Sequence, residues 1–136
     1  MSDFNSLTAS ELGDMIGQGE IDPVELTEHF LSRIETSPIG KKIYSTVTSE
    51  LALEQAKDAR KRALSGRRLS SLDGVPISWK DLFDIKGYPC EAGSELLAGR
   101  LPNQNCEVYN LAEAQGLICL GTVSYTHLTL PTICSV

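Results

Sequence analysis

The chain has 136 residues, with 12 Lys and Arg against 18 Asp and Glu, and a formal net charge of −6. This length suits one domain, and the acidic balance excludes a general binder of nucleic acids or anionic membranes, which needs clustered positive charge. No window approaches the apolar length of a membrane span, and the N-terminus lacks the basic start and apolar stretch of a secretory signal, so we expect a cytoplasmic protein.

Two helices are predicted in the first 40 residues. The run Thr8–Glu11 fits a capping box, in which a hydroxyl and a carboxylate satisfy free backbone N–H groups reciprocally. This first helix would end at Gly17 or Gly19. Asp22–Pro23 then supplies a capping side chain followed by a proline at the first helical position, and the second helix would end before Gly40.

From residue 43 the sequence alternates between strand and helix patterns. A β-branched run predicts a strand over 43–48, and an alanine-faced run predicts a helix over 50–65. A second strand is predicted over 75–79, and a helix over 106–115 leads into a wholly apolar strand over 117–120, which is typical of a strand buried on both faces. The alternation places the chain in the α/β class.

Cations crowd the second half of the helix predicted over 50–65 and the loop after it, at Lys57, Arg60, Lys61, Arg62, Arg67 and Arg68. Such a cluster could bind a phosphate or an RNA. No aromatic residues interleave to stack on bases, however, and cations also suit the C-terminal end of a helix. We therefore expect a solvated helix face.

The last stretch of the chain differs from the rest. Val123–Thr132 contains no Asp, Glu, Lys or Arg, and its ten residues, VSYTHLTLPT, are the translation of a transposase-type library adapter, GTC TCT TAT ACA CAT CTG ACG CTG CCG ACG. The alternative is a genuine strand rich in threonine and leucine. We favour the adapter and expect 1–121 to be native sequence, cut there, and 122–136 to be a non-native tail in which His127 and Cys134 carry no role.

Lys80 stands at the end of the apolar strand predicted over 75–79. Strand ends in α/β folds open onto the ligand crevice, and a lysine partly buried there can act as a base near neutral pH. The alternative, which spacing alone favours, is an exposed cation paired with Asp81 or Asp84.

Other residues offer weaker chemistry. His29 is a lone histidine on a helix, which is usually a surface or packing residue. Ser78 is two residues from Lys80, so both would point to one face of a strand, but no glycine-rich oxyanion loop accompanies this Ser–Lys pair. Ser94 follows a glycine without forming a Gly-x-Ser-x-Gly elbow.

The four cysteines, at 90, 106, 119 and 134, stand at scattered spacings with no CxxC pair. This spacing favours reduced thiols and gives no sign of a disulfide framework, so we expect no metal site and no cofactor. Cys119 lies inside an apolar strand, where a core role is more typical than a nucleophilic one.

The segment Leu72–Asp81 resembles the amidase signature family, whose pattern of Leu, Gly, Pro and Lys-Asp is matched at Leu72, Gly74, Pro76, Lys80 and Asp81. Ala92–Ser94 matches the family's Ala-Gly-Ser after the lysine strand, and Asn105–Gly121 resembles its next helix and strand. The resemblance covers about residues 7–121. It implies the N-terminal portion of the amidase signature fold, a mixed β-sheet flanked by helices, in truncated form.

The resemblance also implies a reaction, namely amide hydrolysis or amide-nitrogen transfer through a Ser–cis-Ser–Lys triad. One serine would attack the carbonyl to form an acyl-enzyme, the second would relay protons, and the lysine would be the ultimate base. Only the lysine maps onto this chain, at Lys80. Both serines belong to a segment beyond its end, and the family's Gly-Lys-Thr run, expected from Gly121, is replaced by Thr122–Val123.

Three interpretations stay open. The chain is a fragment of an amidase acting on a small-molecule amide, a fragment of the glutaminase subunit of a tRNA-dependent amidotransferase, or a truncated reading frame without activity of its own. Trp79–Asp84 looks more like the free-standing amidases. In each case we expect no cofactor, no direct nucleic-acid contact and no membrane.

Overall fold

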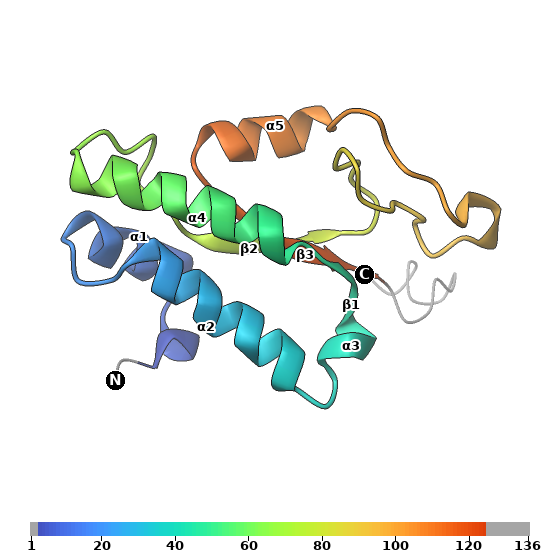
Figure 1. The fold of residues 1–136 in the computed structure, drawn as a ribbon, viewed down its shortest axis with the longest axis horizontal. Helices are drawn as coiled ribbons and strands as arrows, with labels where there is room; N and C mark the ends of the chain where they lie inside the picture. The colour runs from blue at the N-terminus through green and yellow to red at the C-terminus, as the bar shows by residue number, and fades with distance from the viewer. Residues whose placement is uncertain (1–2, 125–136) are drawn as a thin grey trace, which may run out of the picture.

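The structure, a computed structural model, describes residues 3–124 (Figure 1). His127 and Cys134, expected to carry no role, lie outside the described residues. Helices and strands alternate along the chain, so the predicted α/β class is confirmed. The elements in chain order are η1 Phe4–Ser6, α1 Ala9–Gly17, α2 Pro23–Thr36, α3 Gly40–Ile43, β1 Tyr44–Val47, α4 Ser49–Leu64, β2 Pro76–Lys80, η2 Glu95–Leu97, α5 Glu107–Ala114 and β3 Ile118–Val123.

The first two long helices begin where their capping residues predict. The Glu11 N–H donates to Thr8 Oγ1 (3.2 Å), and the Thr8 N–H donates to Glu11 Oε2 (2.7 Å), which is the reciprocal pair of a capping box. Before α2, Asp22 Oδ1 accepts the Val24 N–H (2.7 Å), and Pro23 occupies the first helical position. Both caps satisfy N–H groups that a helix cannot satisfy internally, so both starts are determined locally.

The chain after α2 differs from the prediction. Helix α2 ends at Thr36, and Gly40 begins the short helix α3 instead of marking the end of α2. A Cβ on Gly40 would collide with the Ile34 carbonyl oxygen, so this glycine permits a close approach between α2 and α3. Strand β1 accordingly starts at Tyr44, one residue later than the sequence pattern predicts.

The three strands form one mixed sheet with β3 in the centre. β2 pairs with β3 in parallel, and β1 pairs with it antiparallel. β3 spans Ile118–Val123 and so continues past the predicted end at residue 120, because both neighbouring strands pair with its last residues. A Cβ on Gly121 would collide with the Thr46 carbonyl oxygen, so the glycine lets β1 reach β3.

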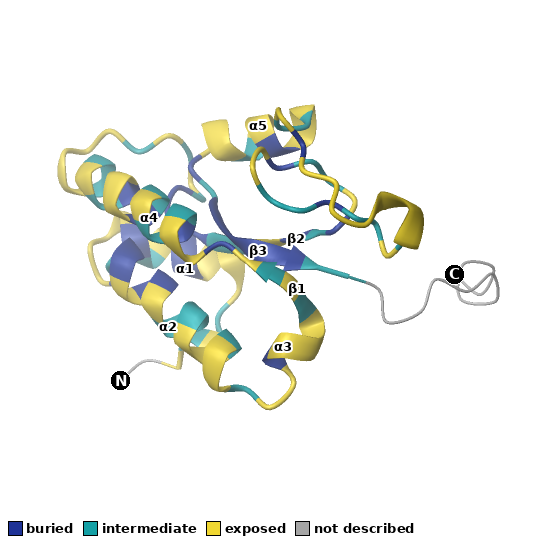
Figure 2. Cartoon of the chain, turned by 45° about the vertical axis from the view of Figure 1, so that its right-hand side comes forward, coloured by how far each residue is buried: buried dark blue, intermediate teal, exposed yellow. Residues whose placement is uncertain are grey.

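Helices cover both faces of this sheet, with α5 above it and α1 and α2 below it in Figure 1. On the α5 face, Trp79 and Tyr109 belong to one buried cluster. On the other face, Val75 joins Leu12 and Ile16 of α1 in a second cluster. Figure 2 shows the result, in which β3 is buried while the outer surfaces of the helices are exposed.

Helix α4 follows β1 in the chain and packs beside β3, beyond the end of the β1–β3 pairing. The Thr48 N–H donates to the Leu120 carbonyl (3.0 Å), which is the last sheet-like contact before α4 begins. In the second turn of the helix, Gln55 Oε1 accepts the Cys119 N–H (2.8 Å), so a side chain replaces the missing strand partner. The alanine face predicted from the sequence packs against Ile118, through Ala52, Ala56 and Ala59.

Candidate active site

Lys80, the predicted base, is the last residue of β2. It is half-buried and pairs across the sheet with Val123 of β3, which pairs in turn with Tyr44 of β1. Trp79 points to the opposite face, where its ring lies 5.3 Å from that of Tyr109 in α5. Because side chains alternate along a strand, Lys80 lies on the sheet face that α5 does not cover.

Ser78 lies on the same side of β2 as Lys80, as their two-residue spacing predicts. It is exposed, and its hydroxyl is hydrogen-bonded to the phenol of Tyr44. This contact joins the two outer strands across the face that carries Lys80. Sequence reasoning missed Tyr44, because only the pairing of β1 with β3 brings it to Ser78, 34 residues away along the chain.

The two carboxylates considered as partners of Lys80 are engaged elsewhere. Asp84 accepts two hydrogen bonds from the Arg100 guanidinium (2.6 and 2.7 Å), which hold the pKa of that carboxyl below its ordinary value. Asp81 is buried, and its Oδ1 accepts the Glu91 N–H (3.2 Å). Burial raises the pKa of Asp81, and hydrogen bonds from nearby backbone N–H groups offset this only in part.

The other candidates from the sequence have structural roles. His29 packs edge-on against the rings of Phe4 and Phe30, with centroids 5.1 and 5.3 Å away. Cys119 is buried in β3, and this burial raises the pKa of its thiol. The Ser94 side chain accepts a backbone N–H at the start of η2. None of the three is placed beside Lys80 by any of these contacts.

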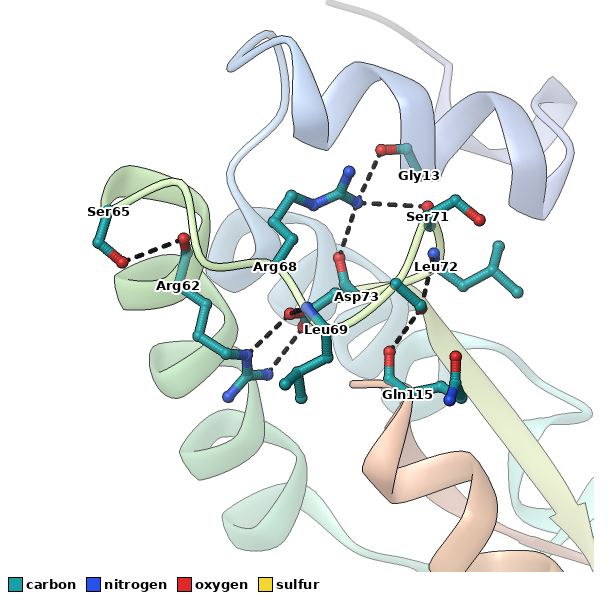
Figure 3. Close-up of polar contacts among 10 residues, drawn as sticks. Gly13, Arg62, Ser65, Arg68, Leu69, Ser71, Leu72, Asp73 and Gln115 are labelled. Atoms are coloured by element: carbon teal, nitrogen blue, oxygen red, sulfur yellow. Dashed lines mark hydrogen bonds and ion pairs between the residues drawn. The ribbon is translucent and has the colours of Figure 1, made fainter.

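The basic cluster at the end of α4 is bound largely to the protein itself (Figure 3). Three of its cations pair with carboxylates, and a fourth donates to main-chain carbonyls; these are Arg60, Lys61, Arg62 and Arg68. A cation that is committed in this way has fewer donors left for a phosphate. Lys61 is exposed, as the predicted solvated helix face requires, whereas Arg62 and Arg68 are half-buried and anchor the loop.

The loop that leads into β2 is anchored by Asp73, whose side chain is 1% exposed. Arg62 donates two hydrogen bonds to this carboxylate, both 2.8 Å long, and the Leu69 N–H donates a third of 2.8 Å (Figure 3). Arg68 bridges the loop to a main-chain carbonyl of α1 (2.9 Å). Together these bonds tie α1, α4 and the loop, and they set where the Lys80 strand begins.

Two hollows of about 680 and 520 Å³ open beside α2, α3 and β1. Both are lined by Ile34 and Tyr44, and Lys80 lines neither. Within residues 3–124, no group of three His, Cys, Asp or Glu side chains is placed to hold a metal ion. In the same part of the chain, no helix has the length and apolar character needed to cross a bilayer.

Comparisons with known proteins agree on one family. The family described as Amidase matches residues 25–135. The A-subunit of glutamyl-tRNA(Gln) amidotransferase from Acinetobacter baumannii is 38% identical over 130 residues, which cover 96% of this chain and 26% of that protein. The mitochondrial A-subunit of the same enzyme from Ornithorhynchus anatinus is 37% identical over 124 residues, covering 91% of this chain and 24% of that protein.

The solved structures lead to the same fold. The native peptide amidase of Stenotrophomonas maltophilia superposes with a TM-score of 0.80 at 22% identity, covering 89% of this chain and 25% of that one. The mixed sheet and its helices are therefore the fold found in part of an amidase signature enzyme. The chain belongs to the amidase family, and it spans about a quarter of the length of the relatives that it matches.

Proposed function

We propose that this chain is part of a cytoplasmic enzyme that hydrolyses a small carboxamide to a carboxylate and ammonia, with Lys80 as the base. The observation that carries the proposal is the position of Lys80 at the C-terminal end of β2, on the sheet face opposite α5, in a chain of the amidase family. Strand ends of this kind are where α/β proteins gather their reacting groups.

The proposed chemistry is acyl transfer through a Ser–cis-Ser–Lys triad. One serine attacks the amide carbonyl, ammonia leaves from the tetrahedral intermediate, and water then releases the carboxylate from the acyl-enzyme. The second serine passes protons between the nucleophile and Lys80, while backbone N–H groups stabilise the oxyanion. In this proposal both serines come from outside the 136 residues, and Ser78 and Ser94 keep the structural contacts described above.

The test uses a graft that supplies the rest of the enzyme. Residues 3–121 replace the corresponding first quarter of the Acinetobacter baumannii relative, and ammonia release is measured with simple amides and with glutamine. We expect Lys80→Ala to lower kcat by about 10²–10⁴-fold, the usual contribution of a general base. Lys86→Ala is the matched control, because Lys86 is an exposed lysine in the next loop. Undiminished kcat in the Lys80→Ala graft, with circular dichroism unchanged, would contradict the role of Lys80.

The 136-residue chain alone should release no ammonia, because it supplies the lysine without the two serines. For the isolated polypeptide, this is the third interpretation above, a truncated reading frame without activity of its own. Turnover by the purified chain that disappears in Lys80→Ala and survives trimming to Gly121 would show that residues 1–121 contain a complete catalytic set.

A second candidate function is the release of ammonia from glutamine for an amidotransferase. The 38% identity to the Acinetobacter baumannii relative favours it. The two candidates differ in substrate range, since a glutaminase needs a pocket for the glutamine side chain and its α-amino and carboxylate groups. A graft that discriminates strongly for glutamine over simple amides supports the amidotransferase role, and equal turnover of both supports the free-standing amidase.

We also propose that residues 122–136 are not native sequence. The identity of Val123–Thr132 with a translated library adapter and its lack of charged residues support this. Thr122 and Val123 complete the β3 ladder through main-chain groups, and the buried Thr122 hydroxyl also contacts that of Ser45 (3.0 Å). Reading the source DNA beyond codon 121 tests the proposal, and an uninterrupted genomic VSYTHLTLPT would overturn it.

A further inference from the structure

A buried carboxylate joins the end of β2 to the loop that follows it. Asp81 comes directly after Lys80 and is 6% exposed. Its N–H donates to the Val123 carbonyl (2.8 Å), which extends the β2–β3 pairing by one residue. Its Oδ1 accepts the Glu91 N–H (3.2 Å). The residue next to Lys80 is therefore bonded through its main chain to the central strand and through its side chain to a loop ten residues further on.

The part of the loop that Asp81 contacts is a strained turn. The Ser94 N–H donates to the Glu91 carbonyl (2.8 Å), and the two residues between them have positive φ, +51° at Ala92 and +67° at Gly93. Two positive φ values define a type I′ turn, which favours asparagine or glycine at its first central position. Within residues 3–124, Ala92 is the one residue other than glycine with positive φ.

This turn persists because its surroundings hold it. Asp81 accepts the N–H at its first residue, and Glu91 Oε1 accepts the Gly99 N–H (2.9 Å) on the far side of the loop. Strained backbone that is held by specific contacts is common at functional sites. The Ala92–Ser94 segment follows the lysine strand, so the strained turn and Lys80 are connected through Asp81.

Burying the Asp81 carboxylate costs free energy when it is ionised. Burial raises the pKa of Asp81, the negative charge of Glu91 raises it further, and the backbone hydrogen bonds from Glu91 and Ala92 lower it. Arg100, the cation on the far side of this loop, is bonded to Asp84 instead. A neutral side chain of the same shape would avoid this cost while keeping an oxygen that can accept the Glu91 N–H.

We propose that Asp81 is a positioning residue, whose hydrogen bonds to the Val123 carbonyl and from the Glu91 N–H hold the Glu91–Ser94 turn against the end of β2 and so fix the strand end that carries Lys80. The inference rests on the proposed role of Lys80. It adds that the geometry at Lys80 depends on a hydrogen-bond acceptor at position 81 whose own atoms do not react.

The experiment uses the 136-residue chain without substrate. Hydrogen exchange of the backbone amides of residues 88–94 reports on the turn, and the rate of acetylation of Lys80 relative to Lys57, an exposed lysine on α4, reports on the site. We expect Asp81→Ala to speed exchange at Glu91 and Ala92 by about ten-fold, as loss of a hydrogen bond to a charged acceptor implies. The Lys80 to Lys57 ratio should change with it by about three-fold or more, while α4 amides keep their protection.

Two further variants separate the hydrogen bond from the charge. Asp81→Asn keeps an oxygen that can accept the Glu91 N–H, so it should leave exchange and the lysine ratio within about two-fold of the wild type. Glu91→Pro removes the donor while leaving Asp81 in place, with Glu91→Ala as its matched control for the lost carboxylate. We expect Glu91→Pro to shift the Lys80 ratio clearly more than Glu91→Ala, which loses only the bond from the Gly99 N–H. The comparison of these two variants tests the proposal even if Asp81→Ala does not fold.

Two results would overturn the proposal. Wild-type exchange at the turn in Asp81→Ala would show that Asp81 does not hold it. A released turn with an unchanged Lys80 ratio, in Asp81→Ala or in Glu91→Pro, would make Asp81 a structural anchor only. Neither readout involves an amide substrate, so failure here is distinct from failure of the grafted enzyme to release ammonia.

Discussion

Asp73 and Asp81 are both buried aspartates, at opposite ends of β2, and the protein compensates them differently. Asp73 accepts a bidentate pair of hydrogen bonds from Arg62 and a third from a backbone N–H. The hydrogen bonds to Asp81 come from the backbone, and burial raises its pKa. A full-charge partner offsets desolvation much better than a peptide N–H does, so we expect the ionised Asp73 to cost the fold less than the ionised Asp81 does.

Asp73→Ala should therefore be strongly destabilising. It leaves the half-buried Arg62 guanidinium without its carboxylate and the Leu69 N–H without its acceptor. Breaking a buried pair from one side costs about 3–5 kcal/mol. The measurement is urea unfolding, with Asp58→Ala as the control, since the exposed pair of Asp58 with Lys61 should contribute less than about 1 kcal/mol. Equal losses in the two variants would contradict the role of Asp73 as the anchor.

Asp81→Asn should have the opposite effect, with a defined pH dependence. Because the folded-state pKa of Asp81 lies above its ordinary value of 3.8, ionisation is less favourable in the folded chain than in the unfolded chain. At position 81 the wild type therefore carries no penalty below pH 3.8 and a growing one as the pH rises through the folded-state pKa. We expect Asp81→Asn to raise Tm near pH 7 and to leave Tm unchanged near pH 3.

Asp84→Asn provides a control of opposite sign. Arg100 lowers the pKa of Asp84, so the ionised carboxylate stabilises the folded chain above the ordinary pKa, and this contribution is lost as the pH falls. Asp84→Asn should lower Tm near pH 7 and have little effect near pH 3. A Tm for Asp81→Asn that is below that of the wild type near pH 7 would show that the carboxylate is not destabilising.

At the scale of elements, the sequence predicts what is decided locally. The starts of α1 and α2 follow from Thr8 and Asp22, because a cap involves residues two or three apart. The parts that it does not predict depend on distant contacts. From the sequence Gly40 is expected to end a helix, and only its close approach to Ile34 in the fold shows why a glycine is needed there. Likewise, the contact of Gln55 with the β3 backbone depends on where β1 ends.

The same division applies to the candidate site. Lys80 can be found from the sequence, because a cation at the end of an apolar strand is unusual in itself. Tyr44 cannot be found, because only the antiparallel pairing of β1 brings it to Ser78. The sequence places Asp81 beside Lys80, but its burial and its bond to Glu91 depend on how the loop folds back.

Gly121→Ala should detach β1 from β3. The new Cβ would collide with the Thr46 carbonyl oxygen, which belongs to the paired strand and cannot move aside without breaking the ladder. We expect the amide of Thr48 to lose protection from hydrogen exchange by about ten-fold or more, because it donates to β3. Gly66→Ala is the control: its site is open and only its positive φ is strained, so it should cost about 1 kcal/mol without affecting β1. Normal protection at Thr48 in Gly121→Ala would contradict the close-approach argument.

On the scale of the whole molecule, the structure has a well-packed centre and an apolar surface beyond it. Trp79 is 8% exposed and packs on Tyr109, whereas Leu96 is 96% exposed and Leu101 is 62% exposed. Figure 1 shows the loop around η2, which carries these leucines, projecting from the body of the fold between β2 and α5. Exposed leucines gathered in one loop favour association between molecules in water.

We therefore expect the purified chain to self-associate through this loop as its concentration rises. Replacing Leu96 and Leu101 together by serine should reduce the apparent mass in sedimentation experiments, because it removes apolar surface without touching the packed centre. The near-UV circular dichroism of Trp79 should stay the same, which separates lost association from lost packing. Leu111→Ser on α5, which is 61% exposed, is the matched control. If this variant and not the loop variant lowers the mass, the associating surface is the outer face of α5; if neither does, apolar exposure is not what drives the chain together.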